Sequence, residues 1–160
     1  MPDIKALVQK QILQIKDPIV KSGLESMLIE PTNHLRDWDY GVKGEQFECW
    51  TIAIDNLHDT SIVYSDFGFG PKRPWGLVFT SKPWIGMDSG WFDNLEECFL
   101  ESHFAGDLPI WCIEKEIESG IRKIVEKDLT SDNAFKIRDD LAKMDKTVRY
   151  HVVSRKNNSA

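Results

Sequence analysis

Hydrophobic positions in the first thirty residues recur at helical spacing. Between residues 3 and 15 the apolar side chains fall three or four positions apart, with Lys and Gln between them, which predicts an amphipathic helix. Asp17 and Pro18 then match an N-cap followed by a first helical residue. The second helix is expected to run from residue 18 to about residue 29. It ends at Glu30-Pro31, because the residue before a proline disfavours helical backbone angles.

The pattern changes to that of extended strands after a loop at residues 32–44. Three segments rich in aromatic and β-branched residues follow, separated by a turn at 56–59 and a glycine- and proline-rich loop at 66–74; they are residues 47–54, 61–65 and 75–80. The linkers are too short for crossover helices, so we expect an antiparallel meander. Residues 47–54 are apolar on both faces, which is typical of a central strand.

Helical spacing returns in the last third of the chain. A helix is expected from a cap at Asp93 or Asn94 to about Phe104. A second helix is predicted by a 3.6-residue period of apolar positions, Ile113, Ile117, Ile121, Ile124 and Val125. Its glutamates come early and its bases late, as the helix dipole favours. Residues 110–113 are either a short strand or the start of this helix.

One more helix and one more strand complete the prediction. The helix begins at Thr130 or Ser131, and its core stripe is Ala134, Ile137, Leu141 and Met144. Residues 147–153 alternate apolar and polar side chains, as in a half-buried strand. The fold class is therefore α+β, a mainly antiparallel sheet of four or more strands with helices packed on it.

Length and composition indicate the kind of protein. The 160 residues, 41% of them hydrophobic, fit a single domain over residues 1–160, with a frayed tail at 154–160. No apolar run is long enough to cross a membrane, and the N-terminus lacks the apolar core of a secretory peptide. We therefore expect a cytoplasmic protein. The three cysteines have apolar neighbours and are expected to be buried thiols.

Acidic residues are concentrated in one window. Residues 88–118 hold nine carboxylates against one base, Lys115, a balance of −8, whereas the whole chain carries −6. From residue 119 onward the balance is +4. A clustered negative surface attracts a cationic partner and repels the phosphates of nucleic acids. The window thus predicts a docking surface for a basic protein; a solvated acidic face is the alternative.

Tryptophans lie just before and within this window. Trp75, Trp84 and Trp91 surround Met87 in a stretch that looks exposed, and tryptophan is a preferred anchor at protein interfaces. Burial in the core is the alternative for these rings. The predicted partner-binding residues are Trp91, Asp93, Glu96, Glu97, Glu101 and Asp107.

The loop at residues 66–76 is a second candidate site. Gly68 and Gly70 permit positive φ, and Lys72 and Arg73 lie between two prolines. Free N–H groups and two bases would suit an anion. No helix follows the loop, so it matches no nucleotide-binding fingerprint. A tightly turned structural loop is the alternative.

No catalytic residue, metal site or cofactor is assigned from the sequence. The four histidines lack metal-ligand spacing. The second hypothesis is a small-molecule or anion-binding domain that uses the loop at 66–76. Hydrolase activity is an added possibility of this hypothesis, with Cys49 as nucleophile and His58 or His151 as base. A structural subunit that forms a homo-oligomer is the third.

The profile of a small acidic α+β chain resembles the immunity proteins of bacterial toxin systems, including those of contact-dependent growth inhibition. The residues that carry the resemblance are Trp91, Asp93, Glu96, Glu97, Glu101 and Asp107. The stretches at 38–41, 48–50 and 68–79 are similar to a pattern in short bacterial proteins. The resemblance implies a cytosolic inhibitor, a monomer or a heterodimer with its toxin, that covers a basic nuclease domain and contacts neither nucleic acid nor membrane.

Overall fold

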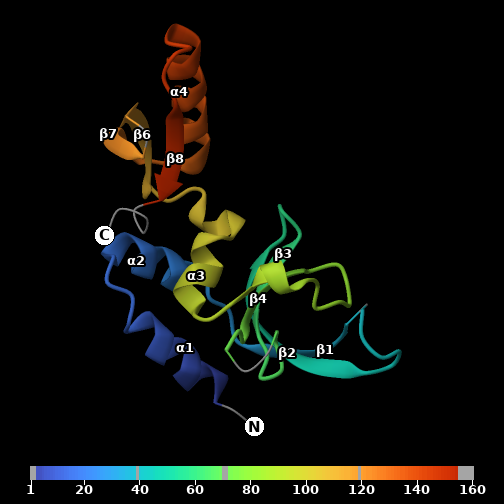
Figure 1. Ribbon diagram of the computed structural model, residues 1–160. Helices are drawn as coiled ribbons and strands as arrows, with labels where there is room; N and C mark the ends of the chain where they lie inside the picture. Colours follow the sequence, from blue (N-terminus) through green and yellow to red (C-terminus); the bar gives the residue numbers. More distant parts are fainter. Residues whose placement is uncertain (1–2, 39, 70–71, 119, 155–160) are drawn as a thin grey trace. The chain divides into compact units, whose positions relative to one another are not determined.

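The computed structural model describes residues 3–38, 40–69, 72–118 and 120–154 (Figure 1). Backbone contacts divide the chain into two compact units, Met1–Ala105 (unit 1) and Gly106–Ala160 (unit 2). The described residues form four α-helices and eight strands, all paired antiparallel within two sheets, so the predicted α+β class is confirmed. The expectation of a single domain over residues 1–160 stays a prediction.

Unit 1 contains a five-stranded sheet in which strand order follows chain order. Its strands are β1 (Thr32–Asp37), β2 (Gln46–Asp55), β3 (Thr60–Tyr64), β4 (Trp75–Phe79) and β5 (Trp91–Phe92). The predicted meander is confirmed as β2, β3 and β4, and β2 lies inside the sheet. The expected loop from Thr32 is wrong at its start, because residues 32–37 pair with β2 as an edge strand. That strand is mostly polar and exposed, so no apolar alternation reveals it.

Three helices of unit 1 lie on one side of this sheet (Figure 1). They are α1 (Ile4–Ile12), α2 (Pro18–Met27) and α3 (Leu95–Leu100). Each begins at a side-chain cap: Asp3, Asp17 and Asn94 accept backbone N–H groups of the first turn. The helices and the middle strands supply the largest buried side chains, among them Ile12, Leu24, Phe99, Ile52 and Ile62.

A second hydrophobic cluster of unit 1 forms around Trp91. Cys49, Val63, Val78 and Ile85 are buried with it, and its indole Nε1 donates a hydrogen bond to the carbonyl of Ile85 at 2.8 Å. Gly76 is required here, since a Cβ at that position would lie 2.7 Å from the Trp91 ring. Of the two interpretations of Trp91, burial in the core is therefore confirmed: Trp91 is only 2% exposed. Its selection as a partner-binding residue does not fit this burial.

Unit 2 contains a three-stranded sheet and one helix. Its elements are β6 (Trp111–Glu118), β7 (Ile121–Leu129), α4 (Ser131–Met144) and β8 (Tyr150–Ser154), with strand order β7-β6-β8. The final helix and strand are confirmed. Ser154, placed in the expected frayed tail, belongs to β8, and residues 155–160 of that tail lie outside the described residues.

The predicted helix through residues 113–125 is wrong, because this segment is the β6–β7 hairpin. Gly120 turns the chain at φ +84°, and the β-branched residues on either side favour strands. The 3.6-residue spacing of the apolar residues is coincidental, because these residues are divided between two strands. Glutamates before the turn and bases after it are cross-strand partners, since Glu116 lies opposite Arg122 and Arg122 reaches Glu114 at 3.7 Å.

Two short 3-10 helices, η1 (Asp88–Gly90) and η2 (His103–Ala105), complete unit 1. The helix expected to continue to about Phe104 ends at Leu100, and η2 follows it. Among the described residues, no helix has both the length and the apolar character needed to cross a membrane.

Candidate partner-binding groove

Unit 1 has a surface groove of about 500 Å³ beside β4. Alternation along the strand sends Val78 into the cluster around Trp91, while Leu77 and Phe79 face the groove. β5 is only two residues long and pairs with Trp75 and Gly76 alone. The end of β4 is thus left uncovered by β5, and the groove occupies this side of the strand.

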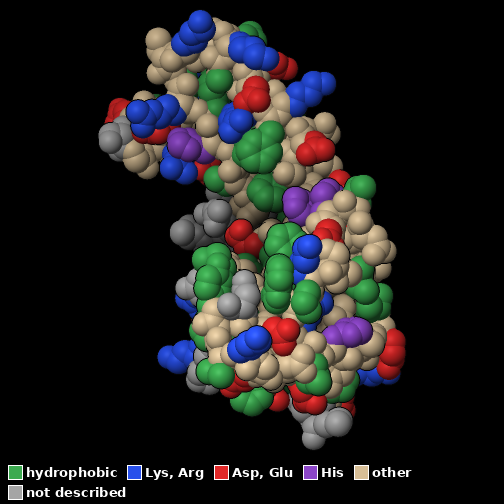
Figure 2. Space-filling view, turned by 90° about the vertical axis from the view of Figure 1, so that its right-hand side faces the viewer, with side chains coloured by type: hydrophobic (Ala, Val, Ile, Leu, Met, Phe, Trp, Pro, Cys, Tyr) green, Lys and Arg blue, Asp and Glu red, His purple; other side chains and the backbone are tan. Residues whose placement is uncertain are grey.

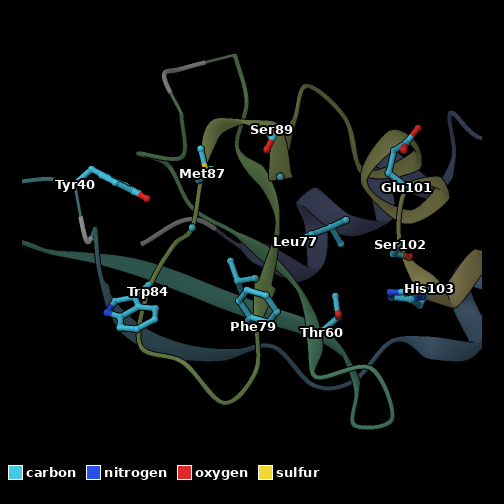
Figure 3. A pocket seen from close by; sticks show the side chains of 13 residues that line it. Tyr40, Thr60, Leu77, Phe79, Trp84, Met87, Ser89, Glu101, Ser102 and His103 are labelled. Atoms are coloured by element: carbon cyan, nitrogen blue, oxygen red, sulfur yellow. The ribbon is translucent and has the colours of Figure 1, made fainter.

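Large apolar side chains are exposed along this groove. Tyr40 is 69% exposed, Phe79 61%, Met87 60% and Trp84 42%. Figure 3 shows Tyr40 and Trp84 at one end and Glu101 and His103 at the other, with Leu77 and Phe79 between them. We refer to this surface, from Tyr40 to His103, as the aromatic groove.

Hydrogen bonds to the end of β1 fix the backbone around Trp84. The amide N–H of Asp37 donates to the carbonyl of Pro83 at 2.7 Å, and the carbonyl of Asp37 accepts from Ile85 at 2.9 Å. Trp84 forms an isolated parallel bridge with Asp37. Lys82 places its ammonium 5.9 Å from the Trp84 ring centre. This wall of the groove is consequently preformed, which reduces the entropic cost of binding.

Two stacked imidazoles mark the polar end of the aromatic groove. His103 stacks on His58 with ring centres 4.2 Å apart, and His58 Nδ1 is 2.6 Å from a carboxylate oxygen of Asp55. Burial alone would raise the pKa of Asp55, but hydrogen bonds from His58 and from the Leu57 amide outweigh it and lower that pKa. Glu101 is exposed next to this pair, so the groove has an acidic group at its rim.

The predicted acidic residues are divided between the two units. Asp107 belongs to unit 2, whereas Asp93, Glu96, Glu97 and Glu101 belong to unit 1. Of these, Glu96 and Glu97 are half-buried, and Glu101 lines the aromatic groove. The acidic residues predicted to bind the partner therefore do not all belong to one unit.

Arg73 of the predicted anion-binding loop lies against one of these acids. Its guanidinium is 3.7 Å from Asp93, and both side chains are at least half exposed, so the pair contributes little to stability. Arg73, Asp93 and Glu97 line one cavity of about 290 Å³. The two predicted sites thus meet and partly neutralise each other.

The described part of that loop turns tightly at Gly68. Gly68 has φ +25°, and a Cβ there would collide with the carbonyl of Arg73, which already accepts the Phe69 amide at 3.3 Å. Lys72 is exposed, and Gly70 lies outside the described residues. Anion binding by Gly68, Gly70, Lys72 and Arg73 stays a prediction.

Cys49, the nucleophile of the alternative hypothesis, is fully buried in β2. Burial raises the pKa of its thiol to about 11, against smaller opposing contributions from Ser65 and Arg36. The thiol is thus protonated at neutral pH, and the thiolate is the nucleophilic form. Among the described residues, no group of three or more His, Cys, Asp or Glu side chains has the arrangement of a metal site.

Comparison with known proteins adds no further constraint. Searches against family models, curated proteins and solved structures returned no significant match. The function must therefore be inferred from the site itself.

The aromatic groove was only partly anticipated from the sequence. Trp84 and Met87 stand in a stretch that looked exposed, and they are exposed. Tyr40 and Phe79 were missed, since one lies in a predicted loop and the other lies inside a predicted strand. The available signal was a large apolar residue placed where the predicted fold gives it nothing to pack against.

Proposed function

We propose that unit 1 is a protein-binding module whose docking surface is the aromatic groove. The observation that carries this proposal is the gathering of four large, exposed apolar side chains, Tyr40, Phe79, Trp84 and Met87, in one preformed groove. Contiguous apolar surface that stays in water is unfavourable and commonly marks an interaction site. Aromatic side chains and methionine are also enriched at protein interfaces.

The partner that fits this surface is a basic protein. Unit 1 has nine Lys and Arg against 16 Asp and Glu, a net charge of −7, whereas unit 2 carries +1. Glu101 stands at the rim of the groove. Opposite charge steers a partner toward the surface and raises the association rate. The occupant of the groove is therefore a basic segment of a partner protein that inserts one or two apolar side chains between Tyr40 and Trp84.

The role that we attach to this binding is inhibition of a toxin in the cytoplasm. A nuclease must be basic to hold nucleic-acid phosphates, so an acidic protein that covers it blocks the substrate. Trp91 has no part in this contact because it is buried. The docking surface is instead the groove with Glu101, and the resemblance to immunity proteins supplies the class of partner.

A growth test addresses this role. The test uses the gene immediately upstream of the gene for this chain. The C-terminal domain of the protein that it encodes is expressed in bacteria, either alone or together with this chain. We expect growth arrest by the domain alone, rescue by the wild-type chain, and loss of rescue with Tyr40→Ala/Met87→Ala. Leu13→Ala is the matched control, because Leu13 is an exposed apolar residue outside the groove. A harmless upstream domain, or equal rescue by all variants, would overturn the proposal.

The charge of the partner is tested separately. Glu101→Lys should slow association with the toxin domain and weaken its salt dependence. Glu25→Lys, an exposed position on α2 outside the groove, controls for net charge. Equal association rates for the two variants would mean that the groove rim does not steer the partner.

A further inference from the structure

A second cavity of about 500 Å³ lies elsewhere on unit 1, next to β1. Its walls come from three strands and the turn at residues 80–83, and most of its lining is polar or cationic. The polar and cationic members are His34, Arg36, Thr51, Ser61, Thr80, Ser81 and Lys82. None of the ten residues that line it is an Asp or Glu. A concave site with convergent donors and no carboxylate favours a negatively charged occupant.

Arg36 is the central group of this cavity. Its side chain belongs to a residue that is 6% exposed, and burial lowers its pKa. One nitrogen, Nη1, donates to the carbonyls of Phe79 at 3.1 Å, Lys82 at 2.6 Å and Trp84 at 3.3 Å. These bonds fix the turn, but they leave the positive charge without a carboxylate, since no ion pair among the described residues includes Arg36.

The hydrogen bonds of Arg36 within the described residues all come from Nη1. Nε is buried without a hydrogen-bond partner. Because Nη1 is occupied by the backbone, the donors that remain are on Nε and Nη2. These two nitrogens form the side of a guanidinium that binds the two oxygens of a carboxylate or phosphate in parallel. A buried unpaired charge is costly, and an oxyanion on this side would offset that cost.

The groups next to Arg36 add hydroxyl donors to the cavity and place one carboxylate close to it. Ser61 Oγ and Thr80 Oγ1 are 2.7 Å apart, so one hydroxyl donates a hydrogen bond to the other. The accepting hydroxyl keeps its own proton, which it can donate to a ligand. The Ser81 hydroxyl is engaged by Asp59, to which it donates at 2.6 Å. The carboxylate of Asp59 thus lies beside this wall, and Lys82 interacts with it electrostatically. The apolar residues of the cavity, Leu35, Ile54 and Pro83, leave room for a short hydrocarbon body.

We propose that this cavity binds a small organic anion through Arg36, with the oxyanion head, a carboxylate or a phosphate, on Nε and Nη2 and a short apolar body against Leu35 and Ile54. This site is separate from the loop at residues 66–76 and from the docking role of the aromatic groove. Phe79 and Trp84, whose carbonyls Arg36 holds, also line that groove. An occupant of the cavity therefore also stabilises one wall of the groove.

The test is a titration of the full-length chain followed by nitrogen-edited NMR. The probes are inorganic phosphate, phenyl phosphate, acetate and benzoate, with sodium chloride at matched ionic strength as the reference. We expect saturable shifts of the Arg36 Nε–H signal and of the amides of Thr80 to Lys82. Phenyl phosphate should bind more tightly than inorganic phosphate, and benzoate more tightly than acetate. Tighter binding of the two phosphates or of the two carboxylates identifies the head group.

Variants complete the test. Lys82→Gln removes the other Lys or Arg charge among the residues that line the cavity, so it should weaken binding about tenfold, whereas Lys72→Gln, on the loop at 66–74, should leave it unchanged. Because Arg36→Lys risks unfolding the turn, the Arg36 Nε–H signal of the wild-type chain supplies the direct readout. Shifts confined to Lys72 and Arg73, or shifts no larger than those in chloride, would overturn the proposal.

Discussion

Units 1 and 2 differ in the apolar side chains that they bury and in their net charge. Unit 1 buries apolar side chains on both sides of its sheet and carries a net charge of −7. Unit 2 carries +1, and its fully or nearly buried apolar residues are Ile110, Cys112, Ile113 and Ala134. In the space-filling view, Lys and Arg side chains are prominent on the unit that contains α4 (Figure 2). The two units therefore differ in both charge and packing.

Exposed apolar residues occur in both units but in different settings. In unit 1 they line a groove with a preformed wall. In unit 2 they lie along β7, where every residue from Ile121 to Asp128 is exposed, including Ile124 at 46% and Val125 at 39%. A groove offers depth and several directions of contact, whereas a bare strand offers one row of side chains. This difference is why we propose unit 1 for the docking surface.

The largest expected effect is on the stability of unit 1. Trp91→Ala removes a buried ring that packs over Gly76 and bonds to Ile85. The cost should be about 3–5 kcal/mol in the free energy of unfolding, measured by urea denaturation with circular dichroism. Ile124→Ala on β7 is the counterpart and should cost less than about 1 kcal/mol, because that side chain is half exposed. Equal losses in the free energy of unfolding for the two variants would contradict the proposed difference in packing between the units.

Alkaline pH should destabilise unit 1 next most strongly. Burial raises the pKa of Cys49 from 9.0 to about 11, and it also raises the pKa of Cys98. Above pH 9 the unfolded chain loses these protons while the folded chain keeps them, so stability is full below pH 9 and falls between pH 9 and 11. For Cys49 alone the loss is about 2–3 kcal/mol.

The measurement is the free energy of unfolding across this pH range, for the wild-type chain and for Cys49→Ala. The variant starts lower because it leaves a cavity, but its curve should be flatter above pH 9. Parallel curves would show that the Cys49 thiol does not titrate with folding.

Helix caps provide a smaller contrast between the units. Asn94 accepts the Glu97 amide at 2.8 Å at the start of α3, whereas Thr130 caps α4 with no side-chain hydrogen bond. Asn94→Ala should cost about 1 kcal/mol, and Thr130→Ala should cost less, both measured by thermal unfolding. A reversed order would mean that α4 depends on its cap more than its geometry indicates.

The sequence predicted those parts of the fold that depend on local patterns. Capping residues at Asp17 and Asn94 located two helices, and the runs of β-branched residues located the meander. It failed where a non-local contact decides the structure. The isoleucines from 113 to 124 fit a helical period, yet pairing with β8 and a turn at Gly120 make them strands.

The candidate sites show the same limit. Charge in sequence does not specify charge in space, so nine clustered carboxylates became two groups in separate units, with Asp93 near Arg73 and Glu114 near Arg122. Trp91 looked exposed because its neighbours are Gly, Asp and Phe, but the gap above Gly76 accommodates its ring. The Arg36 cavity was invisible in the sequence, since it depends on a turn 43 or more residues away.

The most direct test of the central claim compares the two units as docking surfaces. Binding of the C-terminal domain of the protein encoded upstream, the proposed partner, is followed by surface plasmon resonance for Met87→Ala in the aromatic groove and for Ile124→Ala on β7. We predict that Met87→Ala raises the dissociation rate about tenfold or more, as expected for loss of an interface anchor, while Ile124→Ala leaves it unchanged. Faster dissociation of Ile124→Ala together with an unaltered Met87→Ala would place the docking surface on unit 2 and contradict the account.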